Sequence, residues 1–152
     1  MRRKEKEITD ITEIERIIKK ADICRIGLVN GDEAYIVPVC FGYEGKAVYF
    51  HGASEGLKME LIKKNNKICF EMDTDLEMEK MGNACSWEMK YRSVIGVGRA
   101  HILESDEEKI HGLNVLMKQY SEDEFSFPKK KLDSVSVVRI DIESINGKQS
   151  GY

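Results

Sequence analysis

Alternation of apolar and polar residues, interrupted by turn signals, is the feature that most constrains the fold of this chain. Cys24-Arg25-Ile26-Gly27-Leu28-Val29 reads as a strand, and Asn30-Gly31-Asp32 follows it as a strong hairpin signal. Glu44-Gly45-Lys46 predicts a further turn. Six strands are expected, over 24–29, 34–43, 47–51, 67–72, 91–103 and 134–142.

Three residues mark irregular places in these strands. Pro38 has no backbone N–H to donate to a ladder, so the strand over 34–43 is expected at an edge or a bulge of the sheet. Gly96 and Gly98 predict sharp bending of the long strand over 91–103, as at a barrel corner.

Three helices are predicted, and they do not alternate regularly with the strands. Asp10 with Glu13 indicates a capping box that opens a helix over 11–21, and Ser105 with Glu108 opens a helix over 105–120. Another helix opens within 52–58, with Ser54 near its cap, and ends at Asn65-Asn66. Residues 73–88 are polar and Met-rich without a clear period, so a loop is expected there. The pattern favours an α+β, mainly β, fold: one domain over 1–152, built as a six-stranded antiparallel barrel with peripheral helices.

Composition excludes several classes of protein. The 152 residues include 24 Lys and Arg against 27 Asp and Glu, a formal net charge of −3, which argues against a general nucleic-acid binder. No apolar run approaches the roughly 20 residues that span a bilayer, and the basic N-terminus leads into no apolar signal segment. The four cysteines form no CxxC pair, and buried thiols are expected rather than a disulfide framework. A cytoplasmic protein is therefore expected, without nucleic-acid or membrane partners.

The segment from Tyr49 to Lys58 is the most informative for function. Small residues after His51 let a ligand approach the backbone, and the first N–H groups of a following helix attract a phosphate. Lys58, in the first turn, adds a full charge. The plain alternative is an ordinary strand-to-helix turn with a solvated lysine, and Glu55 places a negative charge nearby.

Histidines offer limited chemistry. His51, at a strand end, is placed to exchange protons near neutral pH, although a lone histidine often only forms local hydrogen bonds. His101 and His111 lie far off in sequence, and neither shares metal-ligand spacing with another histidine or cysteine. No metal site is expected.

Met89-Lys90-Tyr91-Arg92-Ser93-Val94 begins the long strand with two cations, a phenol and a hydroxyl. It is either an exposed strand start or a polar wall for an anionic or heteroaromatic ligand. The chain contains no GxSxG, P-loop or GxGxxG motif, so the usual arguments for hydrolases, nucleotide triphosphatases and Rossmann enzymes fail.

Short segments in order from Met1 to about Lys148 resemble the pyridoxamine 5′-phosphate oxidase-related flavoproteins, and particularly their nitroimidazole-resistance (NimA-like) branch. The matching segments are Met1-Arg2-Arg3-Lys4-Glu5 with Ile8-Thr9-Asp10, Cys24-Arg25-Ile26-Gly27-Leu28, Tyr35-Ile36-Val37-Pro38-Val39, Tyr49-Phe50-His51-Gly52-Ala53 with Glu55-Gly56, Met89-Lys90-Tyr91-Arg92-Ser93-Val94, and Gly147-Lys148.

This resemblance implies a split β-barrel homodimer that binds FMN in two equivalent clefts at the subunit interface. The implied cofactor-binding residues fall into three groups. The strand along the flavin ring contributes Ile36, Val37, Pro38, Val39 and Cys40. The segment at the ring edge and phosphate contributes Phe50, His51, Gly52, Ala53 and Lys58, and the long strand adds Arg92 and Ser93. Leu57 stands where relatives commonly carry Arg or Lys, and Cys40 where they frequently carry Asn.

The implied function is an FMN-dependent reductase. A reduced donor delivers electrons to the flavin, which passes them to a small electron-poor acceptor such as a nitroaromatic compound, with His51 as the catalytic proton donor. Vitamin B6 oxidation is not expected, because the match on the substrate side is poor. One alternative is a flavin- or haem-binding module without turnover, in sensing, storage or stress protection, with His51 or His101 as a haem ligand. Another is a structural dimer with an empty cleft.

Overall fold

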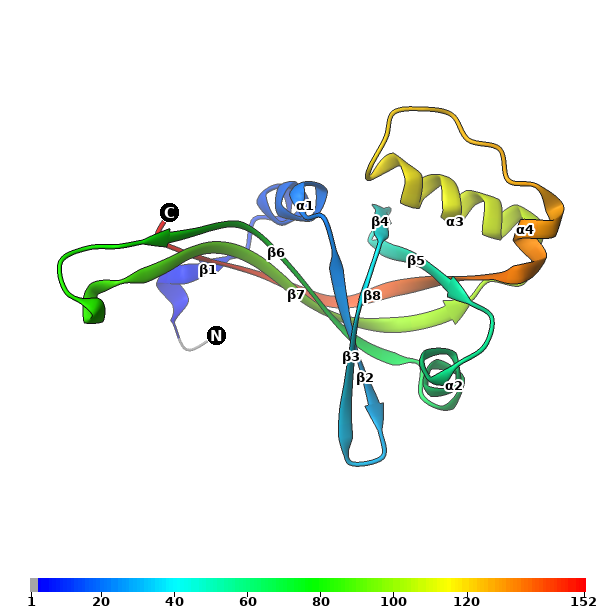
Figure 1. The fold of residues 1–152 in the computed structure, drawn as a ribbon, viewed down its shortest axis with the longest axis horizontal. Coiled ribbons are helices and arrows are strands. Elements are labelled where there is room, and N and C mark those ends of the chain that lie inside the picture. The colour runs from blue at the N-terminus through cyan, green and yellow to red at the C-terminus, as the bar shows by residue number, and fades with distance from the viewer. Residues whose placement is uncertain (1–2) are drawn as a thin grey trace.

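The computed structural model describes residues 3–152 as one twisted antiparallel sheet with helices around it (Figure 1). Met1 and Arg2, the start of the N-terminal match, lie outside the described residues. The strands are β1 Glu7–Ile8, β2 Cys24–Asn30, β3 Glu33–Val39, β4 Phe41–Glu44, β5 Ala47–Ala53, β6 Lys67–Glu79, β7 Glu88–Ile102 and β8 Val135–Ser150. The α-helices are α1 Ile11–Lys20, α2 Leu57–Lys64, α3 Asp106–Lys118 and α4 Lys129–Ser134, with 3₁₀ turns at Lys4–Lys6 and Ala84–Ser86.

The sheet curls into a split barrel that is not closed. Its strand order is β3-β2-β6-β7-β8-β5-β4, with β1 added beside β8. Strands β3 and β4 lie at its two edges, yet only Cys40 separates them in the chain. The expected α+β, mainly β fold is therefore confirmed, and Pro38 does lie on an edge strand, opposite Arg25 of β2.

The expected number of six strands is wrong, because the described residues form eight. The segment over 34–43 is not one strand: it breaks at Cys40, so that its two halves pair with different partners, β2 and β5. The additional strand β1 has two residues, opposite Lys148 and Gly147 of β8, and a segment this short carries no readable period.

The loop expected over 73–88 is largely an extension of the sheet. Strand β6 continues to Glu79 and β7 begins at Glu88, so the two form a long hairpin arm that projects from the barrel (Figure 1). Their register shifts between Thr74 and Glu77, and Asp75 adopts a positive φ of 58° there. No core lies beneath the arm to impose alternation, so the sequence gives no period-two signal.

Helix starts follow the local sequence in part. Ser105 is the N-cap of α3, as expected, and it forms a capping box with Glu108. Asp10 caps α1 by accepting from the Thr12 N–H at 2.9 Å, but Glu13 pairs with Arg16 at 2.7 Å, so the capping box predicted there is wrong.

Helix α2 also begins later than expected. Its N-cap is Gly56, at φ 109°, and Ser54 makes no capping bond. The short helix α4 lies in a segment for which the sequence predicted only the start of a strand at 134.

Two apolar cores fix the barrel. The larger fills its interior between the sheet, α1 and α2, and includes Phe41, Phe50, Phe70, Ile26 and Met72. The smaller lies between α3 and the outer face of β5 and β8, and includes Tyr49, Leu103, Leu113, Leu132 and Val137. Because alternate residues of β5 point to opposite faces, this strand contributes to both cores.

Polar contacts at the end of α3 fix the break between β3 and β4. The Tyr120 hydroxyl accepts from the Phe41 N–H and donates to the Asp22 carbonyl, each at 3.0 Å. The Gln119 amide donates to three carbonyls at the end of α1, those of Ile18, Lys19 and Ala21. These bonds hold α1, α3 and the Cys40 corner together.

All four cysteines are free thiols, as expected, but only Cys24 is buried; Cys40, Cys69 and Cys85 are exposed. Burial raises the pKa of the Cys24 thiol to about 12. The expectation of buried thiols in apolar strand-like segments is therefore wrong for Cys69, which faces outward on β6, and for Cys40, which lies at the corner between β3 and β4; Cys85 lies in the 3₁₀ turn Ala84–Ser86. Among residues 3–152, no helix has both the length and the apolar content to cross a membrane.

Candidate functional site

The end of strand β5 holds the candidate site. Val48 and Phe50 face the barrel interior, whereas Ala47 and Tyr49 face α3. Continued alternation places Gly52 on the barrel side and His51 on the α3 side. His51 is exposed and Phe50 is fully buried.

Lys58 of α2 folds back over the barrel side of this strand end. Its amino group lies 5.4 Å from the centroid of the Phe50 ring, and a Cβ placed on Gly52 would meet Lys58 Nζ at 2.8 Å. No carboxylate forms an ion pair with Lys58 in the described part of the chain. Partial burial lowers the pKa of Lys58. Gly52 thus provides the space that the lysine occupies, and the charge remains available for an anion.

The turn into α2 leaves further donors near Lys58. Gly56 caps the helix without a side chain, and its carbonyl accepts from the N–H groups of Met59 and Glu60. The preceding N–H groups of Leu57 and Lys58 have no intrahelical acceptor, as at any helix start. Leu57 is 43% exposed beside them and carries no charge. These donors, with Lys58, match the chemistry of a phosphate.

The pKa of His51 is lowered from its ordinary value of 6.5, first by burial and second by the charge of Lys58. Both effects favour the neutral imidazole, so His51 takes up its proton at a lower pH than an unperturbed histidine does. Because Lys58 contributes to the shift, an anion bound at Lys58 would offset that contribution and raise the pKa of His51.

The strand predicted to lie along the flavin ring reaches the same corner. Phe41 pairs with Phe50, so Cys40 and the end of β3 come close to the end of β5. Alternate residues Ile36, Pro38 and Cys40 are exposed, whereas Val39 is buried. Cys40 thus lies near His51, whereas residues 36–39 run away from this corner along β3, paired with β2.

Arg92 and Ser93 do not join these residues within one chain. Arg92 pairs with Gln149 on β8, whereas His51 pairs with Val137, and the 12 positions from 137 to 149 correspond to about 40 Å of strand. Arg92 instead binds Asp75 at 2.7 Å and lies 4.0 Å from the Tyr152 ring centroid, beside a pocket of about 350 Å³ against α1.

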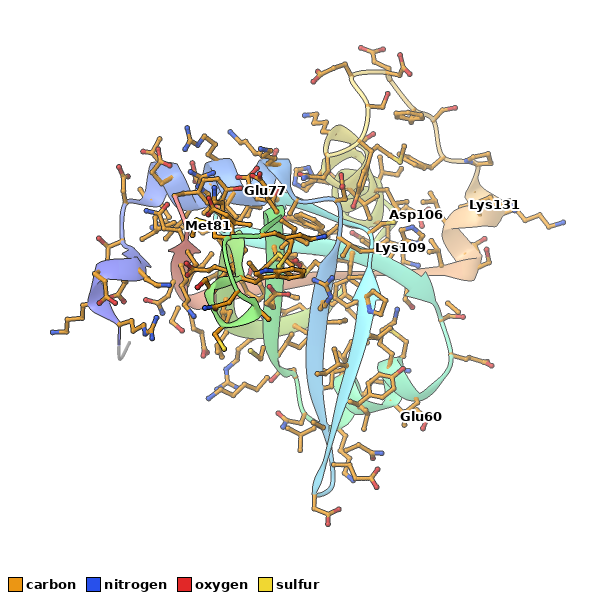
Figure 2. The ribbon with its side chains drawn as sticks, turned by 60° about the vertical axis from the view of Figure 1, so that its left-hand side comes forward. Glu60, Glu77, Met81, Asp106, Lys109 and Lys131 are labelled. Atoms are coloured by element: carbon orange, nitrogen blue, oxygen red, sulfur yellow. The ribbon has the colours of Figure 1, made fainter. Side chains whose placement is uncertain are left out.

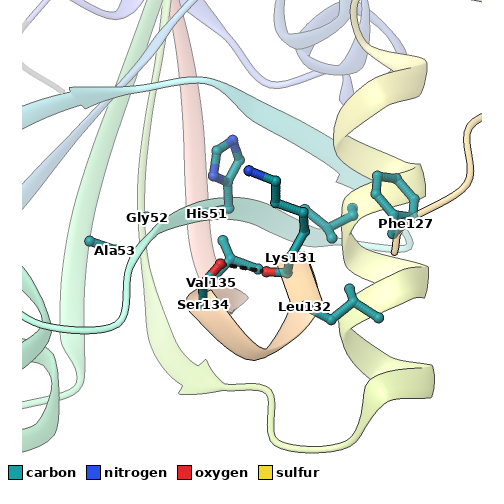
Figure 3. A pocket seen from close by; sticks show the side chains of 9 residues that line it. His51, Gly52, Ala53, Phe127, Lys131, Leu132, Ser134 and Val135 are labelled. Atoms are coloured by element: carbon teal, nitrogen blue, oxygen red, sulfur yellow. Dashed lines mark hydrogen bonds between the residues drawn. The ribbon is translucent and has the colours of Figure 1, made fainter. Parts of the chain in front are cut away.

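A pocket of about 420 Å³ opens on the α3 side of β5 (Figure 3). Besides His51, Gly52 and Ala53, it is lined by residues that were not predicted as site residues: Leu113, Phe127, Lys131, Leu132, Ser134 and Val135. These residues come from α3, the loop before α4, α4 and the start of β8, more than 60 positions after His51. The one local signal was aromatic: Phe125 and Phe127 stand in an otherwise polar loop.

The comparison with protein families identifies the family of this chain. Residues 10–149 match the family described as pyridoxamine 5′-phosphate oxidase. The chain belongs to this family. The comparison with curated proteins gave no match.

Solved structures include members of this fold with different printed descriptions. A candidate 5-nitroimidazole antibiotic resistance protein from Bacteroides thetaiotaomicron is 32% identical, with a TM-score of 0.85, over 94% of this chain and 86% of that one. The flavocytochrome Anf3 from Azotobacter vinelandii (19% identity, TM-score 0.86, 100% and 72% coverage) shares the fold. So does an FAD- and haem-binding protein from Mycobacterium smegmatis (15% identity, TM-score 0.87, 97% and 74% coverage).

The residues of this pyridoxamine 5′-phosphate oxidase family member fit a flavin phosphate. The fit rests on the Lys58 amino group, which lies against Gly52 without a carboxylate partner among the described residues, and on the free N–H groups at the start of α2. Ile36 and Pro38 are exposed apolar residues of β3, the strand that ends at this corner, and they suit the face of a planar ring. The position of Lys58 near Gly52 was predictable because both residues lie in the continuous segment 50–58.

Proposed function

We propose that this protein is an FMN-dependent reductase of small electron-poor acceptors, such as nitroaromatic compounds. The observation that carries the proposal is the Lys58 amino group held beside Gly52, at the one strand end where His51 also lies. The similarity to the Bacteroides protein, at 32% identity, supports the choice of acceptor class.

Each residue has a defined task in this proposal. Lys58 and the N–H groups at the start of α2 bind the phosphate, and the backbone of 36–40 lies along the ring. A bound flavin supplies the electron transfer between a reduced donor and the acceptor. A phosphate bound at Lys58 offsets the charge that lowers the pKa of His51, so His51 can take up a proton at the strand end and donate it to the reduced acceptor.

The proposal includes a homodimer, because the proposed site is incomplete in one chain. Arg92 and Ser93 are separated from His51 by most of the length of β8, and a second copy is the simplest source of such groups. The hairpin arm also exposes apolar side chains without a core beneath them. These are Leu76, Met78, Met81, Trp87 and Met89, which are 42–61% exposed. Figure 2 shows Met81 on this arm, well away from Lys131.

The test of the reductase proposal is single-turnover nitroreduction by His51→Ala compared with the parent chain. We expect both proteins to contain equal FMN, and we expect His51→Ala to transfer electrons to a nitroaromatic acceptor about 10²-fold more slowly. His111→Ala is the matched control, because His111 lies on α3 and pairs with Glu44. An unchanged rate in His51→Ala would overturn the role given to His51.

The visible spectrum of the same purified protein distinguishes the reductase from the alternative, a haem-binding module. His101 is engaged with Asp141 at 3.3 Å, so His51 is the better placed axial ligand. A haem spectrum that disappears in His51→Ala would favour the module over the reductase.

A further inference from the structure

The pocket on the α3 side of β5 has features that flavin binding at Lys58 does not use. Its walls are mainly apolar, from Leu113, Leu132, Val135 and the Phe127 ring, with His51 at one edge (Figure 3). A volume of about 420 Å³ is in the range of small-molecule sites.

One wall of the pocket is held in place by contacts between α3 and α4. The Lys109 amino group donates to the Leu132 carbonyl at 3.1 Å, and Lys129 binds Asp106 at 2.7 Å. Ser134 donates to the Lys131 carbonyl at 3.0 Å, as Figure 3 shows. These contacts fix the backbone from which the Lys131 side chain extends.

Within residues 3–152, the pocket has a positive side chain in its lining and no negative one. Lys131 points toward His51 (Figure 3), and no carboxylate residue lines the pocket among the described residues. The Lys131 amino group makes no ion pair in the described part of the chain, whereas its neighbour Lys129 binds both Asp106 and Asp133. A ligand with a negative group would supply the missing partner.

We propose that this pocket binds an aromatic acceptor that carries a carboxylate, with its ring against Phe127 and its carboxylate at Lys131. The inference rests on the proposed function, because the pocket places the acceptor beside His51, and it names the acceptor class. An aromatic ring fits the apolar walls, and the lysine attracts the negative group at the open rim.

The test compares two probes of nearly equal shape, 4-nitrobenzoate and its neutral counterpart 4-nitrobenzamide. Binding to the purified chain is followed by NMR chemical-shift titration without a reductant. We expect the carboxylate to bind about three- to fivefold more tightly at low salt, and less so at high salt, because Lys131 is exposed. Lys131→Met should abolish the difference, Lys131→Arg should retain it, and Phe127→Leu should weaken both probes.

Lys130→Met is the matched control, since Lys130 is the adjacent exposed lysine and does not line the pocket. Equal binding of the two probes, no binding of either, or the same loss in Lys130→Met would overturn the proposal. FMN content is measured separately on the same samples. Charge discrimination in a chain that binds no flavin would overturn the proposed function and support the pocket. A flavin-loaded chain that binds the two probes equally would support the proposed function and overturn the carboxylate site in the pocket.

Discussion

At the scale of single residues, the electrostatic coupling of Lys58 to His51 is the most testable feature of the site. Burial and the charge of Lys58 both lower the pKa of His51, in that order. We therefore expect His51 to titrate below 6.5, and Lys58→Met to raise its pKa while leaving it under 6.5, because burial remains. NMR titration of the His51 ring checks this.

Lys63→Met, at the other end of α2, is the control for that experiment. It removes an equal charge from the same helix at a position that does not act on His51. If the pKa of His51 were the same in Lys58→Met as in the parent chain, the Lys58 amino group would not lie close enough to the His51 ring to act on it.

Residue-scale prediction from sequence succeeded where the relevant groups are neighbours in the chain. Gly52, Lys58 and His51 lie within eight positions, so one strand-to-helix segment brings them together. Lys131 and Phe127 were missed because their position beside His51 depends on the packing of α3 and α4 against β5. No local pattern encodes that packing.

At the scale of elements, close backbone packing makes one glycine decisive. Gly42 on β4 lies against α3, and a Cβ there would clash with the Val115 carbonyl group and with Leu116 Cα. We expect Gly42→Ala to lower the free energy of unfolding by about 1–3 kcal/mol, because the backbone of α3 must move. Urea denaturation followed by circular dichroism measures it.

Gly27→Ala is the matched control on β2, where the nearest atom to an added Cβ is the Cys69 carbonyl oxygen at an ordinary 3.6 Å. We expect a change there of no more than about 0.5 kcal/mol. Equal destabilisation by both variants would contradict the close packing of β4 against α3.

Elements with strong local signals were predictable, and those defined by distant pairing were not. The hairpin at Asn30-Gly31-Asp32 joins β2 to β3 as expected, since Gly31 adopts a φ of 68° there. The projecting part of β6 and β7, over residues 74–90, contributes to neither apolar core, so it leaves no alternation to detect. The break at Cys40 depends on where the sheet must turn, with Tyr120 holding Phe41 from 79 positions away.

At the scale of the whole molecule, the arm and the composite site predict self-association. Light scattering should give about twice the chain mass of 17.4 kDa. Met78 and Met89 are cross-strand partners on the arm, both exposed. Met78→Glu should shift the protein toward the monomer, because it places a charge on the proposed apolar contact.

Ile110→Glu is the control for that variant, since Ile110 is an exposed apolar residue on α3, away from the arm. It should remain dimeric. A monomeric parent chain at micromolar concentration would contradict the dimer and remove the proposed source of Arg92.

The central claim is that the corner formed by β3, β5 and α2 holds FMN, with Lys58 at the phosphate. The most direct measurement is the visible spectrum of the purified protein, with release of its pigment on denaturation and titration with added FMN. We expect a flavin spectrum, one FMN per chain, and a Lys58→Met variant that binds FMN about 10- to 100-fold more weakly, whereas Lys63→Met binds it normally. A colourless parent chain that fails to bind added FMN would contradict the claim.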